Sequence, residues 1–174
     1  DLPMQCWGLT DIGCVRKMNQ DAFEIRQLDR NTALCVVCDG MGGAKSGNVA
    51  SSLAVDVFSQ EIQRTWTPSM EWDKADQMLK NAVKLANFTV YDQSKQFEEF
   101  SGMGTTLVAA LVRGKQVSVV NQPFAAPHQS ALPVPKSRQV CQLPLGGSQG
   151  VQALRFYHST NRFVPSASRA YSIR

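Results

Sequence analysis

Asp39-Gly40-Met41-Gly42-Gly43 is the stretch from which the fold and the chemistry of this chain are best approached. It directly follows an apolar run, Ala33 to Cys38, that is typical of a buried strand. A segment with helical periodicity comes after it, so a carboxylate stands where a strand ends. The three glycines beside it let the backbone approach a ligand closely. A hard divalent cation prefers carboxylate and carbonyl oxygens together, so the stretch predicts a cation site, although a plain Asp-Gly turn has the same local sequence.

The segments around this stretch predict an α+β domain with two helices packed on a sheet. Residues 22–28 alternate loosely, as a half-buried strand does, and the turn Asp29-Arg30-Asn31 joins them to the strand that ends at Asp39 in a hairpin. Apolar residues recur at helical spacing over 49–62, with Ser46 as the expected cap, and again over 73–95. Further strands are expected at 4–10, 105–112 and 116–120.

Length and composition limit the class of protein. The 174 residues suffice for one domain with a core. They include neither the ~18 consecutive apolar residues of a membrane span nor an opening signal peptide, and since the chain begins at Asp1 we expect a fragment or a processed product. The five cysteines show no framework spacing, which favours a reducing, cytoplasmic location. Cys35 and Cys38 should point to opposite faces of one strand and are interpreted as small buried hydrophobes.

Charge divides the chain at residue 122. Residues 1–121 hold all 14 acidic residues and 12 Lys or Arg, a net charge of −2, whereas residues 122–174 hold six Lys or Arg and no Asp or Glu. This C-terminal segment (residues 122–174) also holds six of the eight prolines, which interrupt any helix or strand. We therefore expect it to be disordered or foreign to the fold. A nucleic-acid-binding tail is disfavoured because the Lys and Arg are not clustered among aromatic residues.

Several familiar chemistries are excluded by the residues present. Both histidines, His128 and His158, lie in the C-terminal segment, which leaves residues 1–121 without a Ser-His-Asp or Cys-His site. A P-loop around Lys45 and zinc-ligand spacings are also missing. The acidic residues remain. The hairpin brings Asp21 and Asp39 toward one end of the sheet, where a cation would relieve their repulsion, and Arg16 lies nearby in the sequence. Metal ions, a phosphate-binding arginine and no nucleophilic side chain suggest attack on a phosphate ester by metal-activated water.

Three motifs together resemble the metal-dependent protein phosphatases of the PPM (PP2C) family, and the Asp-Gly-Met-Gly-Gly form resembles its bacterial branch. In order, they are Val15-Arg16-x-x-Asn19-x-Asp21, Val37-x-Asp39-Gly40-Met41-Gly42-Gly43 and Gly104-Thr105-Thr106 before an apolar strand. Their order and spacing agree over about residues 5–121. The resemblance implies a β-sandwich flanked by helices, incomplete in this chain, and a two-metal Mn²⁺ or Mg²⁺ centre that hydrolyses phosphoserine and phosphothreonine.

The resemblance also assigns roles to residues. Asp39 would bridge the two metals, the Gly40 carbonyl would ligate one, Asp21 would act on a metal through water, and Arg16 would hold the substrate phosphate. Thr105 and Thr106 lie in the motif that supports the centre, but ordinary sheet threonines are as good an interpretation. Phosphoproteins, and a serine/threonine kinase that shares them, are the implied partners, with no nucleic acid and no membrane segment.

Departures from the family pattern lead to a second interpretation. Gln20 stands where the family usually has Glu, which predicts weakened metal binding. After Asn121 the family's Val-Gly-Asp-Ser-Arg-Ala-Tyr is replaced, while residues 168–174 resemble that missing continuation, so an acid-free insert of mistranslated or frame-shifted sequence is one hypothesis; sequencing the gene around codon 122 tests it. The family's later aspartates have no counterpart here. The alternatives are thus an incomplete phosphatase and a pseudophosphatase that acts as a binding module.

Overall fold

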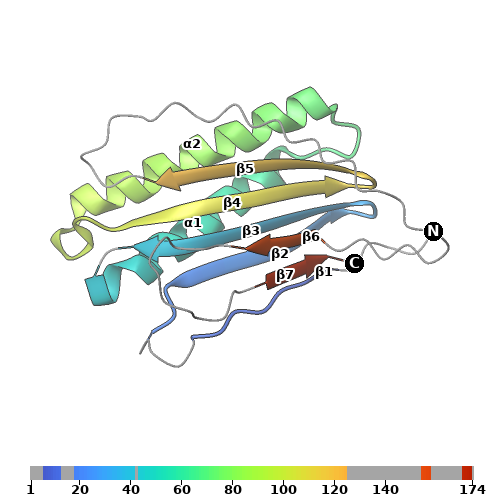
Figure 1. Cartoon of the computed structure of the whole chain (residues 1–174). Coiled ribbons are helices and arrows are strands. Elements are labelled where there is room, and N and C mark those ends of the chain that lie inside the picture. The colour runs from blue at the N-terminus through green and yellow to red at the C-terminus, as the bar shows by residue number, and fades with distance from the viewer. Residues whose placement is uncertain (1–5, 13–17, 42, 125–153, 158–169, 174) are drawn as a thin grey trace.

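The computed structural model describes residues 6–12, 18–41, 43–124, 154–157 and 170–173. An antiparallel four-stranded sheet with strand order β2-β3-β4-β5 organises the chain (Figure 1). Its strands are β2 (Asp21–Asp29), β3 (Thr32–Met41), β4 (Gly104–Arg113) and β5 (Gln116–Phe124). The expected hairpin is confirmed: β2 and β3 pair antiparallel, and the Asn31 amide donates to Asp29 Oδ1 at 2.9 Å in the turn between them.

Strand β5 continues past residue 121, where the sequence predicts the regular fold to end. Pro123 pairs with Thr106, and Phe124 pairs with Thr105 and is buried in the core. A proline is tolerated here because β5 is the edge strand of its sheet, so one side of it needs no backbone donor.

A smaller sheet with strand order β1-β7-β6 lies on the face of the large sheet opposite the helices (Figure 1). Its strands are β1 (Cys6–Trp7), β6 (Leu154–Tyr157) and β7 (Ala170–Ile173), and both pairings are antiparallel. Cys6 packs against the apolar cluster of the large sheet that contains the buried Cys35, which places β1 on that face. The remaining residues of the C-terminal segment lie outside the described residues, so the expectation for that segment stays a prediction.

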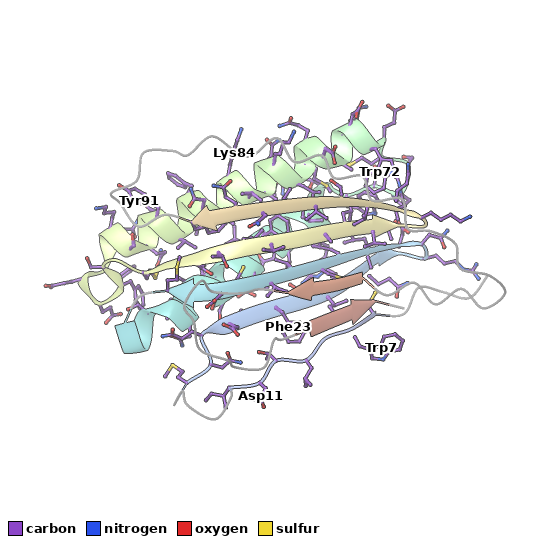
Figure 2. The ribbon with its side chains drawn as sticks, in the orientation of Figure 1. Trp7, Asp11, Phe23, Trp72, Lys84 and Tyr91 are labelled. Carbon is purple, nitrogen blue, oxygen red and sulfur yellow. The ribbon has the colours of Figure 1, made fainter. Side chains whose placement is uncertain are left out.

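Two helices cover the other face of the large sheet. They are α1 (Gly43–Thr65) and α2 (Trp72–Gln96), and a short 3₁₀ helix, η1 (Glu98–Phe100), leads from α2 toward β4. The apolar side predicted for the second helix is confirmed, since all of its expected positions are buried: Ala75, Met78, Leu79, Ala82, Val83, Ala86 and Val90. Lys84 and Tyr91 project from α2 on the side away from the sheet (Figure 2).

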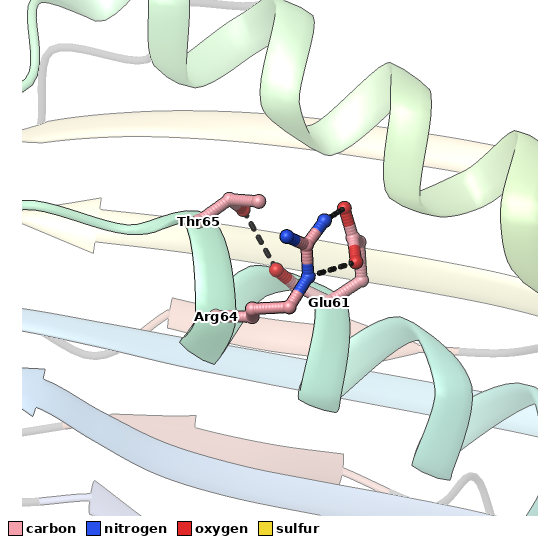
Figure 3. Close-up of polar contacts among 3 residues, drawn as sticks. All are labelled: Glu61, Arg64 and Thr65. Atoms are coloured by element: carbon pink, nitrogen blue, oxygen red, sulfur yellow. Dashed lines mark hydrogen bonds and ion pairs between the residues drawn. The ribbon is translucent and has the colours of Figure 1, made fainter.

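The predicted cap of the first helix is wrong. Helix α1 begins at Gly43 rather than after Ser46, so Ser46 lies inside the first turns of the helix. Its hydroxyl donates to the Glu99 carbonyl at 3.1 Å and thereby ties α1 to η1. The other end of α1 closes as Figure 3 shows: Arg64 pairs with Glu61 through two nitrogen atoms, and the Thr65 hydroxyl donates to the Glu61 carbonyl at 2.7 Å.

The strand residues divide between two apolar layers, as alternation of side chains requires. Leu34, Val36 and Cys38 of β3 face the helices and share a core with Phe58 and Leu79. Cys35 faces the opposite way, into a smaller cluster that also contains three residues of β4 and β5: Ala110, Val112 and Val117. Cys35 and Cys38 therefore lie on opposite faces of the sheet, which confirms the prediction that both are separate buried residues.

Candidate metal centre

The two carboxylates predicted from the sequence stand directly opposite each other. Asp21 is the first residue of β2, and its Cα partner on β3 is Asp39. Directly opposed residues of an antiparallel pair project to the same face, with Cβ atoms about 4.5–5.5 Å apart. Both residues are intermediate in exposure. The hairpin thus presents two like charges side by side at one end of the sheet, an arrangement that a cation stabilises.

The carboxylates lie on the face of the sheet away from the helices. Cys38 belongs to the core beneath α1 and α2, and Asp39 is the next residue, so its side chain projects to the other face. That is also the face of Cys35, which belongs to the smaller apolar cluster. Helix α1 consequently supports the strand ends from behind, and the half-exposed carboxylates lie on the face that also carries the smaller sheet.

Two threonines of β4 hold the backbone of Asp39. The Asp39 amide donates to Thr106 Oγ1 at 3.3 Å, and Thr105 Oγ1 donates to the Asp39 carbonyl at 3.0 Å. The Thr105 hydroxyl is fully buried and lies equally close, at 3.0 Å, to the Thr106 carbonyl. The threonines are therefore not ordinary sheet residues: they bind the carboxylate-bearing residue directly, which the sequence left open.

Gly40 is a position where the fold admits no side chain. A Cβ placed on Gly40 would lie 1.9 Å from the Gly47 carbonyl oxygen of α1, far inside contact distance. A Cβ placed on Gly47 would in turn lie 3.1 Å from the Gly40 carbonyl oxygen. The two glycines let the helix backbone meet the strand end, and Gly47 leaves space beside the carbonyl that is the predicted metal ligand.

Residues just before β2 fix the position of Asp21. Asn19 Oδ1 accepts the Asp21 amide at 3.1 Å, and Asn19 Nδ2 donates to Thr10 Oγ1 at 2.8 Å. The Gln20 carbonyl accepts the Gly40 amide at 3.0 Å, so the chain beside one carboxylate is bonded to the chain beside the other. Arg16, the predicted phosphate-binding residue, lies outside the described residues.

The donors at this end of the sheet fit a hard divalent cation, because Mn²⁺ and Mg²⁺ prefer carboxylate and carbonyl oxygens. Asp21, Asp39 and the Gly40 carbonyl provide such oxygens. Within the described residues no cluster of three or more His, Cys, Asp or Glu side chains occurs. The part of the chain that the structure describes therefore offers a partial ligand set.

Buried thiols next to the site are held in the neutral form. Burial raises the pKa of the Cys38 thiol, an effect that a hydrogen bond with Thr105 partly offsets. Burial likewise raises the pKa of Cys35 to about 12, with smaller contributions from the neighbouring Cys6. Both thiols are therefore held neutral near pH 7, and a buried neutral thiol is a poor nucleophile.

Comparison with known proteins identifies the family. The family described as Protein phosphatase 2C matches residues 15–121. The chain belongs to this family. A serine/threonine phosphatase named stp, from Listeria monocytogenes, is 33% identical over 112 residues, which are 64% of this chain and 44% of that protein. The chain thus spans less than half the length of this curated relative.

Solved structures of the family share the fold. The serine/threonine phosphatase Stp1 from Staphylococcus aureus aligns with a TM-score of 0.62 and 37% identity over 68% of this chain and 46% of that one. The catalytic domain of the phosphatase PstP, solved in complex with two manganese ions, aligns with a TM-score of 0.55 and 28% identity over 68% of this chain and 47% of that one. The fold is therefore that of a phosphatase 2C domain, of which this chain contains an incomplete part.

Sequence reasoning missed two contributors to the site, Gly47 and Ser51 of α1. Both contact the backbone next to a carboxylate, Gly47 at Gly40 and Ser51 at Gln20. A glycine within a helix is the one local signal, because it costs about 1 kcal/mol relative to alanine and is retained there for a packing reason.

Proposed function

We propose that this chain is the N-terminal part of a protein phosphatase that hydrolyses phosphoserine and phosphothreonine in proteins with Mn²⁺ or Mg²⁺ as cofactor. The observation that carries the proposal is the direct opposition of Asp21 and Asp39 in a chain of the phosphatase 2C family. Opposed carboxylates, a close glycine carbonyl and a backbone held by two threonine hydroxyls make a rigid oxygen-donor site.

Residues of this chain have separate roles in the proposed reaction. Asp39 and the Gly40 carbonyl would hold the cofactor, Asp21 would act on a metal through water, and Arg16 would bind the phosphate of the substrate. When bound, the divalent ions supply a Lewis acid that lowers the pKa of water and thereby activates it toward phosphorus. Hydrogen bonds from three residues, Thr105, Thr106 and Asn19, hold the backbones of Asp39 and Asp21 in place. Metal binding therefore does not have to order these two residues.

The partners follow from the same chemistry. The substrates are phosphoproteins, and a serine/threonine kinase that phosphorylates them acts in the opposite direction. The three cysteines among the described residues are free thiols, which fits the reducing conditions of the cytoplasm. None of the helices that the structure describes has the length and apolar character needed to cross a membrane.

A second candidate function, a pseudophosphatase that binds phosphoproteins without hydrolysing them, is favoured by two observations. The described residues offer two carboxylates at the site and no cluster of three metal-binding side chains. Gln20, in place of the family's usual Glu, is a further departure in the same direction.

Hydrolysis of a small aryl phosphate in the presence of Mn²⁺ distinguishes the two functions. The Asp39→Ala variant removes the central carboxylate, and Asp56→Ala, an exposed position on α1, is the matched control. The phosphatase proposal predicts turnover by the wild-type chain and the Asp56→Ala variant, and none above background by Asp39→Ala. No turnover by the wild-type chain above that of Asp39→Ala would favour the binding module.

A further inference from the structure

A single backbone oxygen joins the two strands of the site to helix α1. The Gln20 carbonyl accepts the Gly40 amide at 3.0 Å and the Ser51 hydroxyl at 2.6 Å. Gln20 immediately precedes Asp21, and Gly40 immediately follows Asp39. The acceptor therefore lies next to both carboxylates in the chain, and its position affects the spacing between them.

The Ser51 side chain is positioned to hold the Gln20 carbonyl oxygen in place. It is fully buried in α1, and its hydroxyl also lies 3.2 Å from the Asn48 carbonyl one turn earlier. The contact with Gln20 is the shorter of the two, so the proton is directed to the strand rather than to the helix's own backbone. A buried serine whose hydroxyl leaves its own helix links two elements of structure instead of capping one.

Gly47 strengthens this link from the same side of the helix. It lies four residues before Ser51, one turn along the same face of α1. The absence of side chains at Gly47 and Gly40 lets the two backbones touch, since a Cβ on Gly47 would be 3.0 Å from both the Gly40 carbonyl carbon and the Gln20 side-chain Cδ. One helical face thus contacts Gly40 through Gly47 and Gln20 through Ser51.

We propose that Ser51 is a positioning residue for the cation site formed by Asp21 and Asp39. Its hydroxyl fixes the Gln20 carbonyl and, through it, the distance between the two carboxylates. This inference rests on the proposed function, because it assigns Ser51 a role toward the cation that the carboxylates bind. Outer-shell groups of this kind typically change metal affinity roughly 10-fold or more when they are removed.

The chain offers a matched control for the test. Ser59 is also fully buried in α1, but its hydroxyl has no hydrogen-bond partner among the described residues. Ser51→Ala removes a bonded hydroxyl and Ser59→Ala an unbonded one, with the same loss of atoms. Ser51→Thr keeps the hydroxyl and serves as the rescue variant.

The first readout is amide hydrogen exchange of Gly40 in the full chain without metal. Ser51→Ala should accelerate this exchange about fivefold relative to Ser59→Ala, the factor for one hydrogen bond of typical net strength, and Ser51→Thr should restore it. Unchanged exchange of Gly40 in Ser51→Ala would overturn the inference, whether or not the protein is a phosphatase.

The second readout is the affinity for Mn²⁺ alone, measured well below the unfolding temperature of every variant. We expect roughly tenfold weaker binding for Ser51→Ala, with Ser59→Ala and Ser51→Thr near the wild type. Faster exchange with unchanged affinity would overturn the positioning role and leave Ser51 purely structural. A wild-type chain that binds no Mn²⁺ would overturn the proposed function, and the role of Ser51 toward the cation with it.

Discussion

The two ends of the four-stranded sheet are built in opposite ways. At the carboxylate end, where β2 begins at Asp21 and β3 passes Asp39, polar groups hold the backbone of the acidic residues and leave their side chains half-exposed. At the tryptophan end, defined by Trp66, Trp72 and Arg113, polar groups tie loops to one another. Figure 2 shows Trp72 at this end of α2.

Arg113 organises the tryptophan end. Its guanidinium carbon lies 4.5 Å from the centre of the Trp72 ring and 5.7 Å from that of Trp66, and its Nη1 donates to the Met70 carbonyl at 2.5 Å. Trp66 Nε1 donates to Asp29 Oδ2 at 3.0 Å. These contacts join the α1–α2 connection to the β2–β3 turn and to β4. The comparison indicates that the tryptophan end contributes stability and the carboxylate end contributes the candidate site.

The substitution with the largest expected effect is Gly40→Ala at the carboxylate end. The new methyl group would overlap the Gly47 carbonyl of α1, so strand and helix must separate. We expect a loss of about 3 kcal/mol in the free energy of unfolding, measured in urea, together with the loss of Mn²⁺ binding.

Gly114→Ala at the tryptophan end is its matched control. Gly114 has a positive φ of 58° but open space around it, so only backbone strain of about 1 kcal/mol is expected, with Mn²⁺ binding retained. Equal losses of stability in the two variants would contradict the close contact at Gly40.

Arg113→Ala should separate stability from metal binding. It removes two cation–π contacts and the bond to Met70, and we expect the free energy of unfolding to fall by about 2 kcal/mol. The affinity for Mn²⁺ should stay at the wild-type value. The control is Lys115→Ala, an exposed neighbour in the adjacent turn, which should change neither the free energy of unfolding nor the affinity for Mn²⁺. Weaker Mn²⁺ binding by folded Arg113→Ala would show that the two ends are coupled.

The stability of the protein at alkaline pH tests the burial of Cys35, which lies in β3 between the two ends of the sheet. Its folded pKa of about 12 lies above the ordinary value of 9.0, so the folded state favours the neutral thiol. This preference stabilises the folded state fully below pH 9 and is lost as the pH rises toward 12. The free energy of unfolding should therefore fall by roughly 1–2 kcal/mol between pH 9 and 10.5. Urea unfolding over this pH range should show that the free energy of unfolding depends less on pH in Cys35→Ala than in the wild type. Parallel curves for the two proteins would refute this.

Thr105→Val and Thr32→Val should have the smallest effects and opposite signs. Both threonines are fully buried, one at each end of the sheet, but Thr105 Oγ1 bonds the Asp39 carbonyl while Thr32 Oγ1 has no hydrogen-bond partner among the described residues. We expect a loss of about 1 kcal/mol and weaker Mn²⁺ binding for Thr105→Val. Thr32→Val should be neutral or stabilising in thermal unfolding, and a loss there equal to that of Thr105→Val would count against the role of the hydroxyl.

The buried face of α2, and the hairpin that brings the two carboxylates to one end of the sheet, were predictable from the sequence because both depend on local signals. Apolar spacing gave the buried face of α2, which ends one residue from the expected position at either side. The short turn places Asp29 opposite Thr32, and an irregularity between Gln27 and Asp29 then shifts the register so that Asp21 lies opposite Asp39; the sequence predicts the turn but not this shift.

The rest of the site depends on contacts between distant segments. Ser46 has the local features of a helix cap, yet its hydroxyl bonds Glu99, more than fifty residues away, and the helix begins earlier. The bond from Ser51 to Gln20 likewise has no sequence period. Local rules predict that a strand ends at Pro123, because proline has no backbone N–H. An edge strand tolerates proline, and only the strand order of the sheet shows that β5 is an edge strand.

Titration with Mn²⁺, followed by the electron paramagnetic resonance signal of the free ion, tests the central claim most directly. The wild-type chain and Asp56→Asn, which changes an exposed carboxylate of α1, should bind with equal affinity. Asp39→Asn, which keeps the shape of the side chain and removes its charge, should bind at least about tenfold more weakly. Equal affinity for Asp39→Asn and the wild type would contradict the assignment of this end of the sheet as the metal centre.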